Sequence, residues 1–140
     1  MNAALLDVCR QVEHVDTDAA GVVHFARYAS LLETAVLENL ERLGVGVRHL
    51  GRAGLELAIS ELRMNYFASA RFFDVVRIRV GIDRVGGASC SMSGEIHHTD
   101  TLLASGTLEL CVVSRADGSA VAMPGRMRQV LLECLNGVVA

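Results

Sequence analysis

The stretch HVDTDAAGVVHFARY, residues 14–28, concentrates side chains that can do chemistry. Asp16 and Asp18 are two carboxylates separated by one residue, and His24 follows after a run of small residues. A carboxylate can attack a carbonyl carbon or activate water, and an imidazole can relay a proton. The stretch leads into a helical pattern, and the first N–H groups of a helix are unpaired and carry partial positive charge. These residues predict a site where a carboxylate and a helix N-terminus act on one carbonyl group.

The helix that would position this site is predicted for residues 25–43. Its apolar residues follow a spacing of three and four, and the run ends at Gly44, a residue type that favours helix ends. The apolar set comprises Phe25, Ala29, Leu32, Val36, Leu40 and Leu43. Further alanines and leucines widen the apolar face, so we expect protein to cover most of the first half of the helix.

The second half of the chain changes to the alternation of apolar and polar residues that is typical of strands. Strands are predicted at residues 55–59, 62–66, 76–82, 88–98 and 102–113. The alternation slips by one residue within the first of these regions, which predicts a bulge near Ser60 and Glu61. We expect a loop at residues 44–51, a turn at residues 117–118 and a short helix from Pro124 to Gly137.

Length and composition indicate a single domain spanning residues 1–140. All 13 basic residues are arginine and 16 residues are acidic, and the net charge of -3 gives no general attraction to nucleic acid or membranes. The N-terminus lacks a signal-peptide pattern, and no stretch approaches the roughly 20 apolar residues of a transmembrane helix. Cys9, Cys90, Cys111 and Cys134 form no C-x-x-C pair, so we expect buried, reduced thiols and a cytoplasmic location.

These elements predict an α+β fold in which a curved antiparallel sheet wraps one long central helix. The predicted sheet has one apolar face, and its edges carry neither proline nor lysine. An edge without such protection can pair with a second copy, so we expect a symmetric homodimer that joins sheet to sheet.

Two motifs, DTDAAGVVHFARY at residues 16–28 and MNYFASARFFDVV at residues 64–76, carry a family resemblance. Together with the intervening helix they resemble the hotdog-fold acyl-CoA thioesterases of the 4-hydroxybenzoyl-CoA thioesterase type, over residues 8–114. The resemblance implies a hotdog fold, active sites at a dimer interface and frequent tetramers. It also implies that Asp18 is the catalytic carboxylate and that the N–H of Phe25 polarises the thioester carbonyl.

The chemistry of the individual residues agrees with these implied roles. Asp18 can act as nucleophile or general base, and Gly21 allows close approach of the backbone, whereas Asp16 is expected to be structural. For His24, a proton relay or substrate-positioning role stands beside a packed or capping role. Glu33 lies roughly 12 Å along the helix from its start, so it can serve the carbonyl site only if substrate or a partner chain bridges them.

The acyl pocket is expected to involve Gly21 and Val22 of the turn, together with Tyr66 and Phe67. Tyr28 could line this pocket or pack in the core. The phosphates of coenzyme A require arginine contacts, and the sequence offers no basis for choosing among five candidates. These candidates are Arg63, Arg71, Arg77, Arg79 and Arg84.

We expect no metal and no cofactor. His14, Asp16 and Asp18 have the spacing of a strand face, but the adjacent His97 and His98 would point to opposite faces of their strand. The predicted function is hydrolysis of a thioester of coenzyme A or of an acyl carrier protein. Two alternatives stay open, a hotdog enoyl-CoA hydratase or dehydratase and a non-catalytic acyl-CoA binding protein.

Overall fold

The structure, a computed structural model, describes residues 5–137. The elements are β1 (Val8–Gln11), a 3-10 turn (His14–Asp16), α1 (Phe25–Arg42), α2 (Val47–Arg52), β2 (Leu55–Tyr66), β3 (Val75–Val85), β4 (Ser89–His98), β5 (Thr101–Ser114) and α3 (Gly125–Leu135). The prediction of no N-terminal leader falls partly on residues 1–4, which lie outside the described residues. Within residues 5–137, no helix combines the length and hydropathy needed to span a bilayer.

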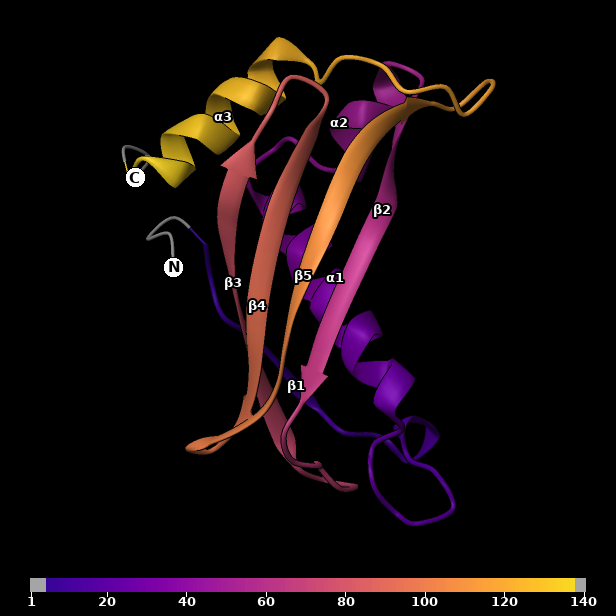
Figure 1. The fold of residues 1–140 in the computed structure, drawn as a ribbon, viewed down its shortest axis with the longest axis vertical. Helices are drawn as coiled ribbons and strands as arrows, with labels where there is room; N and C mark the ends of the chain where they lie inside the picture. Colours follow the sequence, from indigo (N-terminus) through magenta and orange to yellow (C-terminus); the bar gives the residue numbers. More distant parts are fainter. Residues whose placement is uncertain (1–4, 138–140) are drawn as a thin grey trace.

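The strands form one antiparallel sheet in the order β1-β3-β4-β5-β2. The long strands curve, α1 lies across the face they enclose, and α3 packs beside β3 (Figure 1). This arrangement confirms the predicted α+β hotdog fold. The start of α1, the end of β2 and the loops around them lie at one end of the molecule, the lower end in Figure 1.

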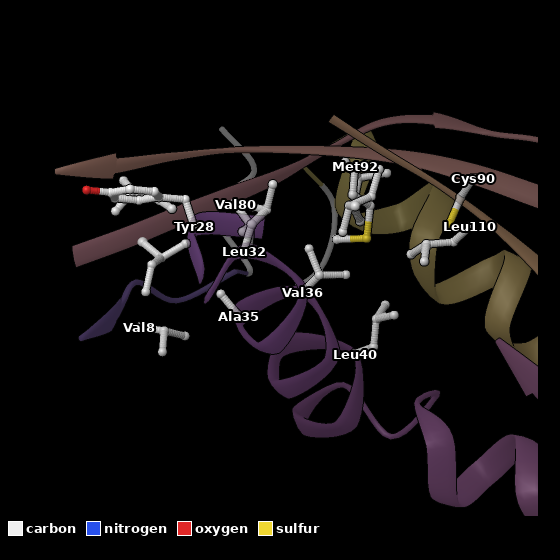
Figure 2. Close-up of a cluster of buried hydrophobic side chains, with 14 of the residues drawn as sticks. Val8, Tyr28, Leu32, Ala35, Val36, Leu40, Val80, Cys90, Met92 and Leu110 are labelled. Carbon is white, nitrogen blue, oxygen red and sulfur yellow. The ribbon is translucent and has the colours of Figure 1, made fainter. Parts of the chain in front are cut away.

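One stripe of α1 fills the core. Tyr28, Leu32, Val36 and Leu40 are spaced four residues apart, and each is at most 3% exposed. Figure 2 shows this stripe facing strand residues that include Val80, Met92 and Leu110. Apart from Tyr28 the core is mainly aliphatic, and burial of such side chains stabilises each by about 1.5–3 kcal/mol relative to exposure.

Two opposed glycines bring α1 close to the sheet. Gly94 of β4 pairs with Gly106 of β5, and Leu32 packs against both. A Cβ atom at Gly94 would lie 2.5 Å from Leu32 Cδ1, and one at Gly106 would lie 2.8 Å from Leu32 Cδ2. Any larger residue at either position would force Leu32, and at Gly106 also Met64, to shift. The sequence pattern did not reveal this contact, because it depends on which strands are neighbours.

The predicted bulge in β2 is confirmed between Ile59 and Glu61. It keeps the apolar side chains before and after it on the helix-facing side of the sheet. Ile59 lines a cavity beside α1, and the ring of Tyr66 contacts the ring of Tyr28 on the same helix, with centroids 5.8 Å apart. Without the extra residue, Tyr66 would point away from the helix.

Several other expectations can be compared with the structure. The observed β3, β4, β5 and α3 overlap their predicted ranges, and α1 ends just before Gly44, which has a φ of 78°. The loop predicted for residues 44–51 is wrong in part, because α2 (Val47–Arg52) forms there and buries Leu50 against the core. The first half of α1 is also less covered than predicted within one chain, since Phe25 is 64% exposed.

The prediction that all four cysteines are buried is wrong for two of them. Cys90 and Cys134 are buried, Cys111 is half-buried, and Cys9 is exposed. Cys9 lies on the short strand β1, whose Val8 faces the core, so alternation turns Cys9 outward. Burial raises the pKa of the Cys90 thiol to about 11.

Candidate active site

Asp18 lies in a tight turn just before α1, and its carboxylate is exposed. The turn is closed by two backbone hydrogen bonds, from Asp18 N–H to the Val22 carbonyl (2.9 Å) and from Gly21 N–H to the Asp18 carbonyl (3.0 Å). The Ala20 N–H donates to Asp18 Oδ1 at 2.8 Å. Gly21 has a φ of 81°, a conformation that other residues rarely adopt, so the turn requires glycine there. The carboxylate of Asp18 is thus held by one bond and accessible to a substrate.

Asp16 has a different environment, although only one residue separates it from Asp18. Its side chain is 7% exposed and pairs with Arg27, which donates from Nε at 2.9 Å and from Nη2 at 2.8 Å to Oδ1. The other carboxylate oxygen accepts from the Glu13 N–H at 2.8 Å. With its carboxylate committed to these donors, Asp16 joins the N-terminal turn to the first turn of α1, which agrees with the predicted structural role.

His24 is the N-cap of α1. Its Nδ1 accepts a hydrogen bond from the Ala26 N–H at 3.1 Å, and its carbonyl accepts from the Arg27 N–H at 2.9 Å. Because Nδ1 is an acceptor, the neutral ring carries its proton on Nε2. The capping interpretation of His24 therefore has direct geometric support, and the ring also stacks on Phe25 with centroids 4.6 Å apart.

The cap leaves one amide available at the start of α1. The N–H groups of His24, Ala26 and Arg27 are bonded to Asp16, His24 Nδ1 and the His24 carbonyl, respectively. Among the residues that the structure describes, the Phe25 N–H has no acceptor. A lone exposed donor at the positive end of a helix dipole is suited to bind an oxygen that gains negative charge.

The loop at residues 67–74 holds the turn and the helix start together. The Val23 N–H donates to the Ala70 carbonyl at 2.9 Å, and Val22 forms a β-bridge with Arg71. The Ala70 N–H donates to the hydroxyl oxygen of Tyr28 on α1 at 3.0 Å. The loop thus joins the turn through main-chain contacts and α1 through the side chain of Tyr28.

The predicted pocket aromatics divide into one core residue and exposed ones. Tyr28 is 3% exposed, and burial raises the pKa of its phenol, so it stays neutral and packs in the core. Tyr66 and Phe67, at the end of β2, are 45% and 61% exposed. The ring of Phe25 meets the edge of Tyr66 with centroids 6.3 Å apart. The exposed rings of Phe25 and Tyr66 form an apolar surface beside the helix start, and Phe67 is exposed at the adjoining end of β2.

Glu33 lies apart from this group. It is half-buried and lines a cavity of about 240 Å³ between α1, α2, β2 and β5, with apolar neighbours that include Val36, Leu37 and Leu57. The ion pair of Arg115 with Glu56 lies at the same cavity, at 3.1 Å. Within one chain, Glu33 therefore does not join Asp18 and the Phe25 N–H.

Reasoning from sequence missed one residue of the site, Arg27, and did not distinguish a second, Arg71, from four other arginines. Arg27 pairs with Asp16 across eleven positions of the chain, and the guanidinium of Arg71 lies against the turn, with Nη1 3.9 Å from where a Cβ of Gly21 would be. Arg27 was visible only as one of thirteen basic residues, and Arg71 only as one of five candidate phosphate ligands. The described residues contain no group of three or more His, Cys, Asp or Glu side chains arranged to hold a metal ion.

The fold and the helix start together define a hotdog-fold protein with a carboxylate turn ahead of its central helix. The family model of the thioesterase-like superfamily matches residues 12–131. The chain belongs to this superfamily, and its enzyme class is that of a thioester hydrolase.

Individual relatives agree with this assignment. The chain is 26% identical to the acyl-CoA thioesterase YbgC of Haemophilus influenzae over 119 residues, which covers 84% of this chain and 88% of that protein. It is 28% identical to a 1,4-dihydroxy-2-naphthoyl-CoA hydrolase of Synechococcus over 129 residues, covering 88% and 87%. The crystal structure of a probable thioesterase from Bartonella henselae is 26% identical, with a TM-score of 0.79 over 85% of this chain and 98% of that one.

Proposed function

We propose that this protein hydrolyses an acyl thioester of coenzyme A or of an acyl carrier protein, releasing a carboxylic acid and a free thiol. The observation that carries the proposal is the N–H of Phe25 at the start of an 18-residue helix, which has no acceptor among residues 5–137, directly after the turn that carries the exposed carboxylate of Asp18. The named relatives act on coenzyme A thioesters, which favours coenzyme A as the carrier.

The reaction needs both groups. The thioester oxygen accepts a hydrogen bond from the Phe25 N–H, and this bond strengthens as the carbonyl becomes a tetrahedral oxyanion. One such donor contributes about 3–4 kcal/mol in the transition state. Asp18 either attacks the carbonyl carbon itself or removes a proton from the water that does so. When Asp18 attacks, the C–S bond breaks to leave a mixed anhydride with Asp18, and water then hydrolyses this anhydride to release the acid and restore the carboxylate. When Asp18 activates water, the water adds to the carbonyl carbon and the C–S bond breaks directly. In both routes the thiolate leaves and takes up a proton.

The remaining candidates take secondary roles in this proposal. His24 caps the helix by accepting from the Ala26 N–H, while Gly21 and Val22 shape the turn. The rings of Tyr66 and Phe67 offer apolar surface to the acyl group.

We also propose that the protein works as a homodimer or a larger homo-oligomer in the cytoplasm, with residues 1–140 forming one domain. The edge strand β2 supports an oligomer, because Ile59, Leu62 and Tyr66 on it are all more than 40% exposed in the single chain. Light scattering coupled to size-exclusion chromatography tests this part, and a monomer at micromolar concentration would contradict it.

The test of the catalytic proposal is thiol release from a panel of short, long, branched and aromatic acyl-CoA thioesters and one acyl carrier protein thioester. The variant is Asp18→Asn, whose amide oxygen can still accept from the Ala20 N–H and so preserves the turn. Asp117→Asn is a matched control, because Asp117 is exposed and accepts from the Ser119 N–H at 2.9 Å in a turn of the same kind. Asp117 follows β5, in a different turn from the one ahead of α1.

We expect Asp18→Asn to lower kcat about 100-fold or more and Asp117→Asn to leave it unchanged. If Asp18→Asn keeps its rate, Asp18 is not the catalytic carboxylate, and Glu33→Gln becomes the variant to measure. Wild type that releases no thiol from any substrate contradicts hydrolysis. Tight acyl-CoA binding without turnover would then indicate a binding protein, and loss of enoyl absorbance with an enoyl-CoA would indicate a hydratase.

A further inference from the structure

Arg71 differs from the other four arginines that the sequence offers as phosphate ligands. Each of the other four forms an ion pair with a carboxylate of this chain. These pairs are Arg63 with Glu61, Arg77 and Arg79 with Asp7, and Arg84 with Glu109. Among the described residues, no carboxylate pairs with Arg71, and no acceptor binds its guanidinium. A cation already neutralised by a carboxylate is a poor anion site, whereas an unpaired guanidinium has all five donors free.

The position of Arg71 relative to the helix start is held by main-chain contacts. Val22 and Arg71 form a β-bridge, and the next residue of the turn segment, Val23, donates to the Ala70 carbonyl. The guanidinium extends to Gly21, with Nη1 3.9 Å from the place of a Cβ atom there. Arg71 therefore lies along the segment that leads from the turn to the Phe25 N–H.

The length of the segment from Gly21 to Phe25 indicates which substrate phosphate can lie beside Arg71. Gly21 precedes Phe25 by four residues, so their Cα atoms lie at most roughly 14 Å apart, and the guanidinium lies 3.9 Å from the place of a Gly21 Cβ atom. The pantetheine arm between a thioester sulfur and its phosphate has about as many chain atoms as four residues, so its extended reach is also roughly 14 Å. A thioester bound at the helix start can thus place the phosphate at the end of its arm beside Arg71.

We propose that Arg71 binds the phosphate that ends the pantetheine arm of the substrate. This inference rests on the proposed thioester hydrolysis and deepens it by naming the phosphate ligand. The same phosphate occurs in coenzyme A and in the phosphopantetheine of a carrier protein, so the chemistry is common to both sources. Planar guanidinium and phosphate oxygens form paired, charge-assisted hydrogen bonds, and a glutamine in place of arginine cannot form them.

The experiment presents one acyl group on four carriers to wild type, Arg71→Gln and Arg77→Gln. The carriers are coenzyme A, 4′-phosphopantetheine, pantetheine without phosphate, and an acyl carrier protein. Arg77→Gln is the matched control, because Arg77 is an exposed arginine of the same sheet region that is already paired with Asp7. We expect Arg71→Gln to raise KM about 10- to 100-fold for the thioesters of coenzyme A and 4′-phosphopantetheine. The KM of Arg71→Gln for the pantetheine thioester should change less than about twofold. The KM values of Arg77→Gln should match those of wild type for all four carriers.

Wild type should hydrolyse either the coenzyme A thioester or the carrier-protein thioester with the higher kcat/KM, and the better substrate identifies the natural source of the phosphate. Arg71→Gln should raise the KM for that substrate. An equal loss on the pantetheine thioester would overturn the proposal, since Arg71 would then act on Asp18 or the turn. A loss on coenzyme A but not on 4′-phosphopantetheine would also overturn it, because the contact would be to the nucleotide. Unchanged KM values in Arg71→Gln for all four carriers would also overturn the proposal.

Failure of the proposed function is seen separately, as absence of turnover by wild type on all four carriers. The phosphate contact remains testable in that case by calorimetric titration with coenzyme A, with pantetheine as the phosphate-free probe. We expect coenzyme A to bind wild type about 10-fold or more tightly than Arg71→Gln, and equal affinities would overturn the proposal. Because the guanidinium has no partner within the described part of the chain, Arg71→Gln should unfold at the same temperature as wild type.

Discussion

Replacing Asp16 should lower stability and spare catalysis, whereas replacing Asp18 should spare stability and abolish catalysis, although only one residue separates the two. Replacing Asp16 by alanine removes both bonds from Arg27 and the bond from the Glu13 N–H. Bonds to a charged group typically contribute about 1.5–3 kcal/mol, but the Arg27 side chain is 43% exposed and regains water when released. We therefore expect Asp16→Ala to lower the free energy of unfolding by about 2 kcal/mol.

The matched change Asp18→Ala removes only an exposed bond from the Ala20 N–H, so we expect a loss within about 0.5 kcal/mol. Urea unfolding and thermal unfolding at one fixed protein concentration measure both variants. For a chain of this length, about 2 kcal/mol corresponds to a decrease in Tm of roughly 6 °C. A double-mutant cycle of Asp16→Ala with Arg27→Ala should return a coupling of about 1 kcal/mol.

The outcome that refutes this reasoning is equal stability of the two single variants, or a coupling of zero between Asp16 and Arg27. Either result would mean that the pairing seen at the helix start contributes nothing. Activity measured at a temperature where both variants are folded provides the second comparison. Asp18→Ala should be inactive there, and Asp16→Ala should retain activity because its carboxylate does not face the substrate.

Three further predictions concern other parts of the chain. His24→Ala should lower the free energy of unfolding by about 1 kcal/mol because the N-cap is lost. His24→Asn should keep the N-cap, with stability and activity close to those of wild type. A rate loss of about 100-fold in both variants would instead support a proton relay. In native protein at pH 8, Cys9 should react first with a disulfide reagent and Cys90 last, because burial raises the pKa of Cys90 to about 11. Equal rates would contradict the buried thiol. The hydrogen bond from Ser91 lowers the pKa of Glu109 in the folded protein. The stabilisation that this bond gives the fold is therefore complete above the ordinary glutamate pKa of about 4.3, and it is lost as the pH falls through the lower pKa of the folded state. Ser91→Ala should therefore cost about 1 kcal/mol at pH 7 and less at pH 3, as measured by urea unfolding, and a pH-independent cost would exclude this linkage.

Local patterns determined most of the elements. The spacing of apolar residues in α1, the glycine after it, the alternation in the strands and the phase slip at Ser60 and Glu61 were all readable, because each depends on near neighbours in the chain. The motif at residues 16–28 also pointed to Asp18 and Phe25, since a carboxylate ahead of a helix start is itself a local feature. The short helix α2 was missed, because its glycines favour a loop and its formation depends on burying Leu50 in the core.

The tertiary structure separated residues of the same type by their contacts. The resemblance already assigned Asp16 and Asp18 different roles, but only the folded chain shows the contact that holds Asp16, its pairing with Arg27. In the same way, five arginines were indistinguishable until four of them were found paired and Arg71 was found against the turn. Charge pairing, burial and strand neighbours are relations between residues far apart in the chain. A local pattern carries no information about those relations, so only the folded structure could settle them.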